Sequence, residues 1–249
     1  MLTSEQLAEY DARGFVRVDG FASTDVCGAM LQRVIDIARA QAAGDRSTGW
    51  VLPEANLAGN EGEPEELVSK IFRLHRDGVF HEWITSAAVT DIASSIVGPR
   101  VDCFLSQFIF KNPGAWGQPW HQDSHYFLFG PDNGGRPIVG LWLAVTEATL
   151  DNGCLHVVPG SHKEPVHEHV DDRRPGANYG YREIVDFDFT SSVAVTMNVG
   201  DLLVFDSHLM HRSTDNVSNG IRAAMVYHCA ATGTVDLAGH VINDFMTVR

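Results

Sequence analysis

The sequence predicts a mainly β fold, a jelly roll or barrel with helices packed outside it. Three observations support this class. Helical periodicity is confined to the N-terminal part, which ends at Gly98-Pro99. From there onward, short runs rich in Val, Ile, Phe and Trp alternate with clusters of Gly, Pro, Asn and Asp. The spacing of these runs favours a double-sheet jelly roll over βαβ units.

We expect a single domain over residues 1–249, with helical support at about 1–98 and the jelly-roll core at about 99–249. A short helix capped by Thr3 or Ser4 runs to about Asp11, and a strand follows at 15–18. The remaining predicted elements of the helical part are a helix at about 23–43, a loop at 44–63, a segment at 67–74 and a helix at about 79–96.

Apolar runs bounded by turn residues predict the strands of the second part. They lie at 101–110, 119–127, 138–145, 154–158, 193–197, 201–205 and 221–229. The run at 119–127 also carries several side chains that can bind a metal.

Composition excludes several function classes. The formal net charge is −14 and no basic run exists, which argues against a nucleic-acid surface. The four cysteines lie far apart without a CxxC pair, which speaks against a zinc knuckle and fits a reducing compartment. The first residues lack the basic region and apolar core that are typical of a signal peptide, and no apolar run is long enough for a membrane span. We therefore expect a cytoplasmic protein without a nucleic-acid or membrane partner, and its oligomeric state stays open.

His121 and Asp123 form the first candidate site. Side chains alternate between the two faces of a strand, so both would point the same way while Gln122 points opposite. An imidazole and a carboxylate commonly bind a divalent metal together, and one more His would complete the facial triad of non-haem Fe(II) oxygenases. His208 and His211, which end the run GDLLVFDSHLMHRS, are the two candidates, and the residues alone do not separate them.

Four further histidines lie in a polar stretch rich in Pro and Gly, where solvated loop residues are the ordinary case. These are His156, His162, His167 and His169. We interpret them as solvated, because their spacing matches no metal-binding pattern.

Three motifs now point to a family. WHQDSHYF, NGCLHVVPGSHK and GDLLVFDSHLMHRSTDNVSNGIR, in this order, resemble the phytanoyl-CoA dioxygenase family of Fe(II)/2-oxoglutarate oxygenases over roughly residues 101–229. The resemblance implies a cupin-like double-stranded β-helix core. In the family, the third metal ligand is a His followed two residues later by Ser and eleven residues later by Arg. It therefore implies Fe(II) ligands at His121, Asp123 and His211, and 2-oxoglutarate contacts at Ser213 and Arg222.

The resemblance also implies less specific contacts. Further cosubstrate contacts are expected at Lys70, Gln107 and Trp142. The elements expected to face the substrate are His125, Tyr126, Phe127 and the loops at 44–63 and 163–182.

The expected reaction uses Fe(II), 2-oxoglutarate and O₂ to hydroxylate a small organic or acyl(-CoA) substrate, with release of succinate and CO₂. A carboxylate at Asp123 argues against a halogenase, in which a small residue frees a position for halide. Two alternatives stay open at this point. One is a non-catalytic metal-binding jelly-roll protein, and the other is a metal-dependent cupin-type enzyme that does not use 2-oxoglutarate.

Overall fold

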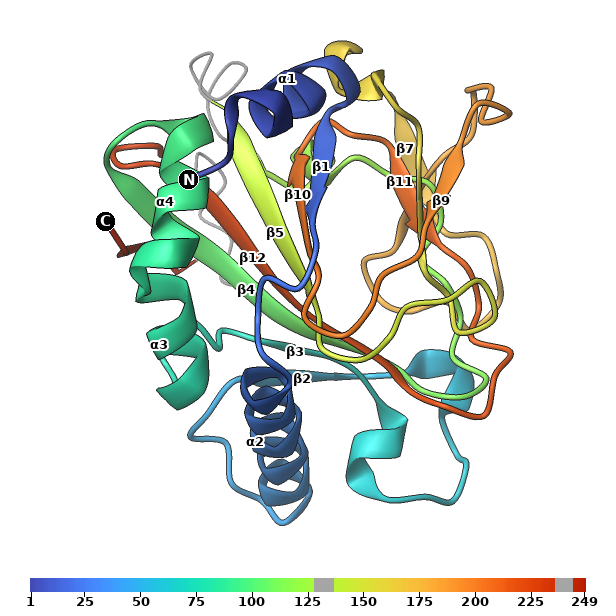
Figure 1. Cartoon of the computed structure of the whole chain (residues 1–249). Coiled ribbons are helices and arrows are strands. Elements are labelled where there is room, and N and C mark those ends of the chain that lie inside the picture. The colour runs from blue at the N-terminus through green and yellow to red at the C-terminus, as the bar shows by residue number, and fades with distance from the viewer. Residues whose placement is uncertain (128–136, 236–243) are drawn as a thin grey trace.

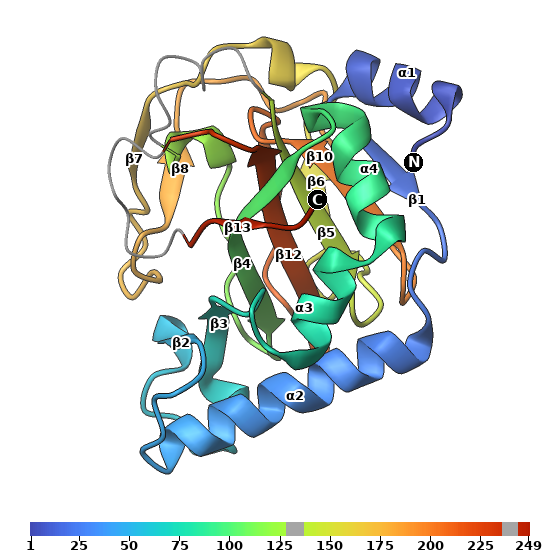
Figure 2. The same cartoon turned by 90° about the vertical axis from the view of Figure 1, so that its left-hand side faces the viewer.

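A large antiparallel sheet forms the centre of the computed structural model, which describes residues 1–127, 137–235 and 244–249 (Figures 1 and 2). In this part of the chain the sheet has eight strands. In pairing order they are β1 (Phe15–Val18), β10 (Leu202–Asp206), β5 (Ile138–Ala144), β12 (Arg222–Ala231), β4 (Val101–Lys111), β3 (Val68–Phe72) and β2 (Trp50–Pro53), with β13 (Met246–Thr247) pairing with β4. Strands from both halves of the sequence therefore share one sheet.

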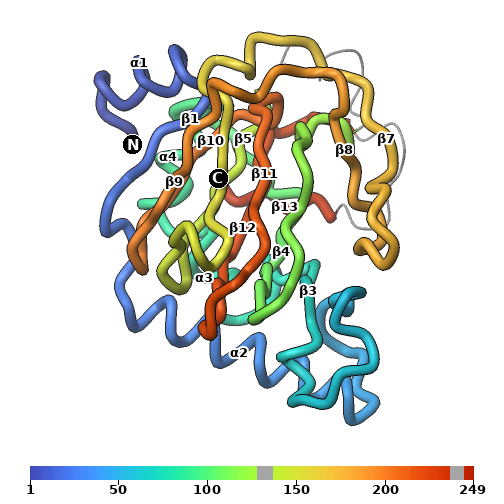
Figure 3. The backbone as a smooth tube through the Cα atoms, turned by 90° about the vertical axis from the view of Figure 1, so that its right-hand side faces the viewer, coloured from blue at the N-terminus to red at the C-terminus, as the bar shows by residue number. Residues whose placement is uncertain are grey.

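A smaller sheet lies opposite this one and is seen in Figure 3 at β9 and β11. It consists of β11 (His211–Ser213), β6 (Leu155–Val157) and β9 (Val193–Val195). A two-stranded ribbon, β7 (His169–Asp171) with β8 (Arg182–Ile184), lies beside it. Two facing antiparallel sheets agree with the predicted jelly-roll class.

Helices cover the other face of the large sheet (Figure 2). They are α1 (Ser4–Arg13), α2 (Thr24–Ala42), α3 (Gly78–Thr85) and α4 (Ala87–Val97). Buried residues at helical spacing on α2, such as Met30 and Val34, join the same apolar cluster as Met225 and Tyr227 of β12. Because side chains alternate along β12, its other face is left free for the cavity described below.

The N-terminal part contains more strand than predicted. The segment 67–74 contains β3, and the predicted loop at 44–63 contains β2. Every residue of β3 is buried, and a short apolar run of this kind cannot be told from a helical segment by periodicity. The predicted helix at about 79–96 is two helices, because Ser86 adopts an extended conformation between α3 and α4.

The predicted strand at 119–127 is wrong. Only His121 forms a β-bridge, with His211, and the 3₁₀ turn η3 (Asp123–His125) follows directly. The turn forms because the carbonyl groups of Gln122 and Asp123 accept hydrogen bonds from the backbone N–H groups of residues 125 and 126. The other six predicted strands correspond to β4, β5, β6, β9, β10 and β12, while the short strands β7, β8, β11 and β13 were not predicted.

Candidate active site

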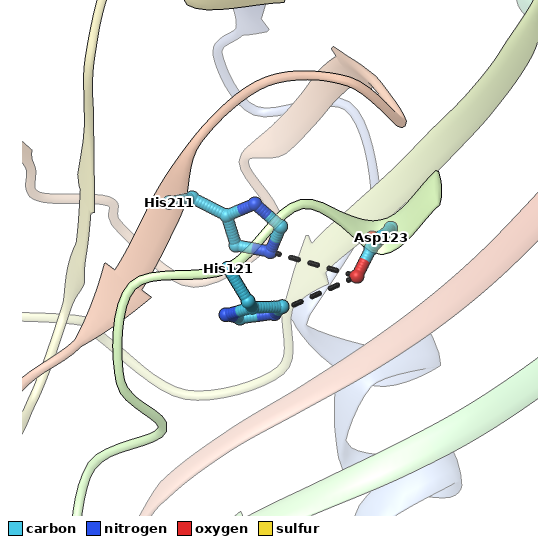
Figure 4. A group of neighbouring side chains, drawn as sticks. All are labelled: His121, Asp123 and His211. Carbon is cyan, nitrogen blue, oxygen red and sulfur yellow. Dashed lines mark ion pairs between the residues drawn. The ribbon is translucent and has the colours of Figure 1, made fainter. Parts of the chain in front are cut away.

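His121, Asp123 and His211 converge between the two sheets (Figure 4). The Asp123 Oδ1 atom lies 3.6 Å from His121 Nε2 and 3.8 Å from His211 Nε2. One ligand atom from each residue lies within 4.8 Å of the other two, and all three residues are buried. His211 is the first residue of β11, and its bridge to His121 places the two imidazoles side by side.

Backbone carbonyl groups hold both imidazoles in a metal-binding orientation. The His121 ring donates from Nδ1 to the Pro119 carbonyl at 2.7 Å, and the His211 ring donates from Nδ1 to the Leu209 carbonyl at 2.9 Å. Each ring therefore keeps its hydrogen on Nδ1 and presents the Nε2 lone pair toward Asp123. Burial, and then the neighbouring His121, lower the pKa of His211 to about 4, so this imidazole is neutral, as a metal ligand must be.

Asp123 is held as a carboxylate by its surroundings. Burial works against the ionised form, yet the pKa of Asp123 lies well below its ordinary value. The hydrogen bond that favours the carboxylate comes from His228 of β12, whose Nε2 lies 2.7 Å from Asp123 Oδ2. Two imidazoles and one carboxylate that converge in this way fit a divalent metal such as Fe(II).

A cavity of about 360 Å³ opens beside the three ligands. Alternate residues of β4 and β12 form one wall, and His211 and Ser213 of β11 belong to the opposite wall. The wall residues on β4 and β12 are Leu105, Gln107, Ile109, Lys111, Arg222, Val226 and His228, and Phe110 of β4 also contacts the cavity. The metal ligands and the predicted cosubstrate residues therefore face one cavity.

Arg222 is a buried cation in the wall of this cavity. Its side chain is 1% exposed, its Nε donates to the Gly153 carbonyl at 3.2 Å, and its guanidinium lies 5.6 Å from the Trp142 ring centroid. Its Nη1 has no hydrogen-bond partner within the described part of the chain. Burial lowers the pKa of Arg222 to about 10, so the group still carries a positive charge at neutral pH. A buried cation with an unpaired N–H group is costly, and a carboxylate ligand would satisfy it.

The structure brings most of the other predicted site residues to the same cavity. They are Lys70, Gln107, Trp142, Ser213, Tyr126 and Phe127. Lys70 Nζ donates to Gln118 Oε1 at 2.9 Å and lies 4.9 Å from the Tyr181 ring centroid. His125 does not line the cavity, because its ring stacks on His169 at a centroid distance of 4.1 Å.

Gln122 and His169 support the metal ligands from outside. The Gln122 amide donates to the carbonyl groups of Pro165 and His208 and accepts from the backbone N–H of His167. The Gln122 backbone N–H donates to His169 Nε2 at 3.0 Å. Gln122 thus points away from the metal, as the sequence suggests. The interpretation of the loop histidines as solvated is wrong: His169 is buried, and the other three are half-buried.

The sequence did not single out His228 or Lys111. Arg222 and His228 are six positions apart on β12, so strand alternation places them on one face, and this signal could have found His228. Lys111 is the last residue of β4 and pairs with Arg222 of β12. This pairing depends on the strand register, so the sequence gives no local signal for it.

Comparison with known proteins decides the family. The family model described as phytanoyl-CoA dioxygenase (PhyH) matches residues 10–224. The chain belongs to the phytanoyl-CoA dioxygenase family. It is 30% identical to phytanoyl-CoA dioxygenase 1 of Oryza sativa subsp. japonica, over 93% of this chain and 90% of that relative. It is 29% identical to the peroxisomal phytanoyl-CoA dioxygenase of Bos taurus, over 92% of this chain and 69% of that relative.

Solved structures confirm the fold of this family member. EvdO2 from Micromonospora carbonacea var. aurantiaca, solved with 2-oxoglutarate, superposes with a TM-score of 0.69 at 22% identity, over 96% of this chain and 94% of that chain. The phytanoyl-CoA dioxygenase relatives and the three converging ligands confirm the predicted enzyme class, an Fe(II)- and 2-oxoglutarate-dependent dioxygenase. Among the described residues, no helix is long and apolar enough to span a bilayer.

Proposed function

We propose that this dioxygenase hydroxylates a small organic or acyl substrate and releases succinate and CO₂ from 2-oxoglutarate. One observation carries the proposal: buried Arg222, whose Nη1 has no partner among the described residues, faces the same cavity as the three metal ligands. The arginine can bind a carboxylate and the three ligands can bind a metal. 2-Oxoglutarate requires both, because its distal carboxylate binds a cation while its 2-oxo acid group chelates the metal.

His121, Asp123 and His211 would hold Fe(II) through Nε2, Oδ1 and Nε2. Two imidazoles and one carboxylate leave positions open for a chelating 2-oxo acid and O₂, and the bound iron supplies the oxidising chemistry. Because a carboxylate fills the position at Asp123, the ligand set supports hydroxylation rather than halogenation. A buried site also keeps bulk water away from the reacting atoms.

Arg222 would bind the distal carboxylate of 2-oxoglutarate with its planar fork. The Gly153 carbonyl holds Nε, and the Trp142 ring lies beside the guanidinium, so the group has little freedom to turn. An arginine suits this task better than a lysine because its N–H donors match the two oxygens of a carboxylate. Ser213, on the opposite wall of the same cavity, offers a hydroxyl group.

Apolar and aromatic side chains would receive the substrate. Tyr126, Phe127, Leu105 and Phe72 line the cavity beside the metal ligands, and Trp50 lies at its exposed side. These walls favour an apolar portion of a substrate. The acyl-CoA substrate named for the relatives is one candidate, and a free small molecule is the other. The predicted substrate contact at His125 and the predicted cytoplasmic location stay predictions.

The test is anaerobic binding of 2-oxoglutarate to the Fe(II)-loaded protein, measured by calorimetry and by the visible absorption of the chelate. We expect wild type to show both signals, and Arg222→Ala to lose affinity by roughly 100-fold. Arg100→Ala, which removes an exposed arginine, is the matched control and should bind as wild type does. A protein that binds Fe(II) but shows no 2-oxoglutarate chelate would be one of the two alternatives, a non-catalytic metal protein or a cupin-type enzyme.

Substrate identity requires a separate screen. Succinate release would be measured with acyl-CoAs, the corresponding free acids and amino acids. Release that is stimulated by one class and abolished by Asp123→Ala identifies the substrate class. Full succinate formation by Asp123→Ala would contradict the proposed metal site.

A further inference from the structure

Lys111 is a buried lysine that the proposed mechanism does not use. It ends β4 and lies directly opposite Arg222 of β12, and both side chains line the cavity. Lys111 is 3% exposed and Arg222 is 1% exposed. Two like charges opposite each other on paired strands are destabilising, and burial increases the cost. This end of the cavity is therefore built to receive negative charge.

The Nζ group of Lys111 is fully used by three oxygen atoms. It donates to the Thr214 carbonyl at 2.7 Å, to Ser213 Oγ at 2.9 Å and to the Trp116 carbonyl at 3.2 Å. An ammonium group has three hydrogens, so none remains for a ligand in the cavity. Lys111 therefore acts on a bound carboxylate through its neighbours rather than by a hydrogen bond of its own.

Ser213 is the neighbour through which Lys111 can act on a bound carboxylate. Its Oγ accepts from Lys111 Nζ and also from the backbone N–H of Gln118 at 3.1 Å. A hydroxyl oxygen has two lone pairs and one hydrogen, so both acceptor positions are filled and only the hydrogen remains. Within the described part of the chain, the Ser213 hydroxyl donates to no protein acceptor, and Ser213 lines the cavity that contains Arg222.

We propose that Lys111 is a positioning residue that directs the Ser213 hydroxyl hydrogen toward the distal carboxylate held by Arg222. The inference rests on the proposed function, since it concerns the same cosubstrate. Close packing supports it: a Cβ atom added at Gly153, where φ is +87°, would lie 2.6 Å from Lys111 Cδ and 2.4 Å from the Thr214 carbonyl oxygen. Gly153 thus leaves room for Lys111 while its carbonyl holds Arg222.

The protonation state of Lys111 decides the direction of the Ser213 hydrogen. Two of its three partners are carbonyl oxygens, which only accept, so a neutral amine would use its two hydrogens there and take the Ser213 hydrogen on its lone pair. Burial, and then the charge of Arg222, lower the pKa of Lys111 well below its ordinary value, while Glu54 and Asp215 raise it. A bound dicarboxylate adds negative charge and favours the ammonium form, in which the Ser213 hydrogen is free for the ligand.

The experiment is a double-mutant cycle on Fe(II)-dependent 2-oxoglutarate binding, measured anaerobically by calorimetry. We expect Lys111→Met and Ser213→Ala each to weaken binding roughly tenfold, because Ser213→Ala removes the hydrogen bond to the carboxylate and Lys111→Met removes the group that directs it. The double variant should also lose roughly tenfold rather than roughly 100-fold, because both changes remove the same interaction. Lys163→Met, at an exposed lysine, is the matched control.

A second ligand separates positioning from general damage. 2-Oxobutyrate has the same chelating group but no distal carboxylate, so Lys111→Met should change its affinity by less than about twofold. Equal weakening of both 2-oxo acids, additive effects in the cycle, or unchanged 2-oxoglutarate affinity in Lys111→Met would overturn the inference. If the methionine variant does not fold, Lys111→Gln enters the same cycle. Failure of wild type to bind 2-oxoglutarate would instead reject the proposed function.

Discussion

His228 Nε2 donates a hydrogen bond of 2.7 Å to Oδ2 of Asp123. Asp123 Oδ1, the other oxygen, is the one that faces His121 and His211. The hydrogen bond therefore selects which oxygen is presented to a metal and fixes the plane of the carboxylate. A β-bulge between β12 and β4 at His228 and Cys229 aims this side chain, as bulges beside active sites commonly do.

We expect His228→Phe to weaken metal binding by roughly 10- to 100-fold, because Asp123 loses the partner that orients it. The phenylalanine ring fits an environment already made of Phe104, Phe127 and Phe205, so folding should be preserved. His228→Gln, whose amide offers an N–H donor, should recover part of the affinity. Anaerobic Fe(II) titration measures the effect, and an unchanged affinity in His228→Phe would show that Asp123 is oriented without it.

Metal should stabilise the fold only while the three ligands are intact. A metal that binds the native state alone raises the free energy of unfolding by about 2.7 kcal/mol at a hundredfold excess over Kd. We expect Mn(II) to raise the melting temperature of the chelator-treated wild type and to have little effect on Asp123→Ala. Asp186→Ala, at an exposed aspartate, should respond as wild type does. An equal metal-induced shift in Asp123→Ala would show that the ion binds elsewhere.

Gln122 joins three separate segments, so its loss should destabilise the protein. Gln122→Ala leaves the Pro165 and His208 carbonyls and the His167 N–H without their partner, and we expect a loss of about 1–3 kcal/mol in the free energy of unfolding. Urea denaturation measures it. Gln32→Ala, at an exposed position on α2, should change stability by less than about 0.5 kcal/mol. Equal stabilities of the two variants would show that the hydrogen bonds of the Gln122 side chain do not stabilise the fold.

Because of Asp244, the free energy of unfolding should fall as the pH drops into the acid range. Its hydrogen bonds to Arg76 hold the pKa of Asp244 below its ordinary value of 3.8, so the folded state favours the ionised form. The stabilisation is present above the ordinary pKa and is lost as the pH falls through the folded value. Because Arg76 is half exposed, we expect about 1 kcal/mol or less. Urea midpoints of Asp244→Asn should lie below wild type at neutral pH and approach it in acid, whereas a constant gap would exclude this ionisation.

The helical periodicity of α2 and the apolar runs of β4, β5 and β12 were predictable because the pattern that buries an element is local. The split at Ser86 and the turn at Asp123 were not, since a cap or a 3₁₀ turn depends on hydrogen bonds that periodicity does not record. The residues alone could not separate His208 from His211. The family spacing favoured His211, and in the structure His211 bridges to His121 and its imidazole lies beside that of His121.

By itself, the sequence predicted the fold class and the family, and it marked His121 and Asp123 as candidate ligands, because these depend on patterns and spacings within short segments. Only the tertiary structure decided which groups hold those ligands. His228 and Asp123 are 105 positions apart, and Lys111 and Ser213 are 102 apart. Such contacts follow from strand register and sheet packing, and local patterns carry no information about which strands become neighbours. For the same reason, the buried pair of Arg222 and Lys111 became visible only in the folded sheet.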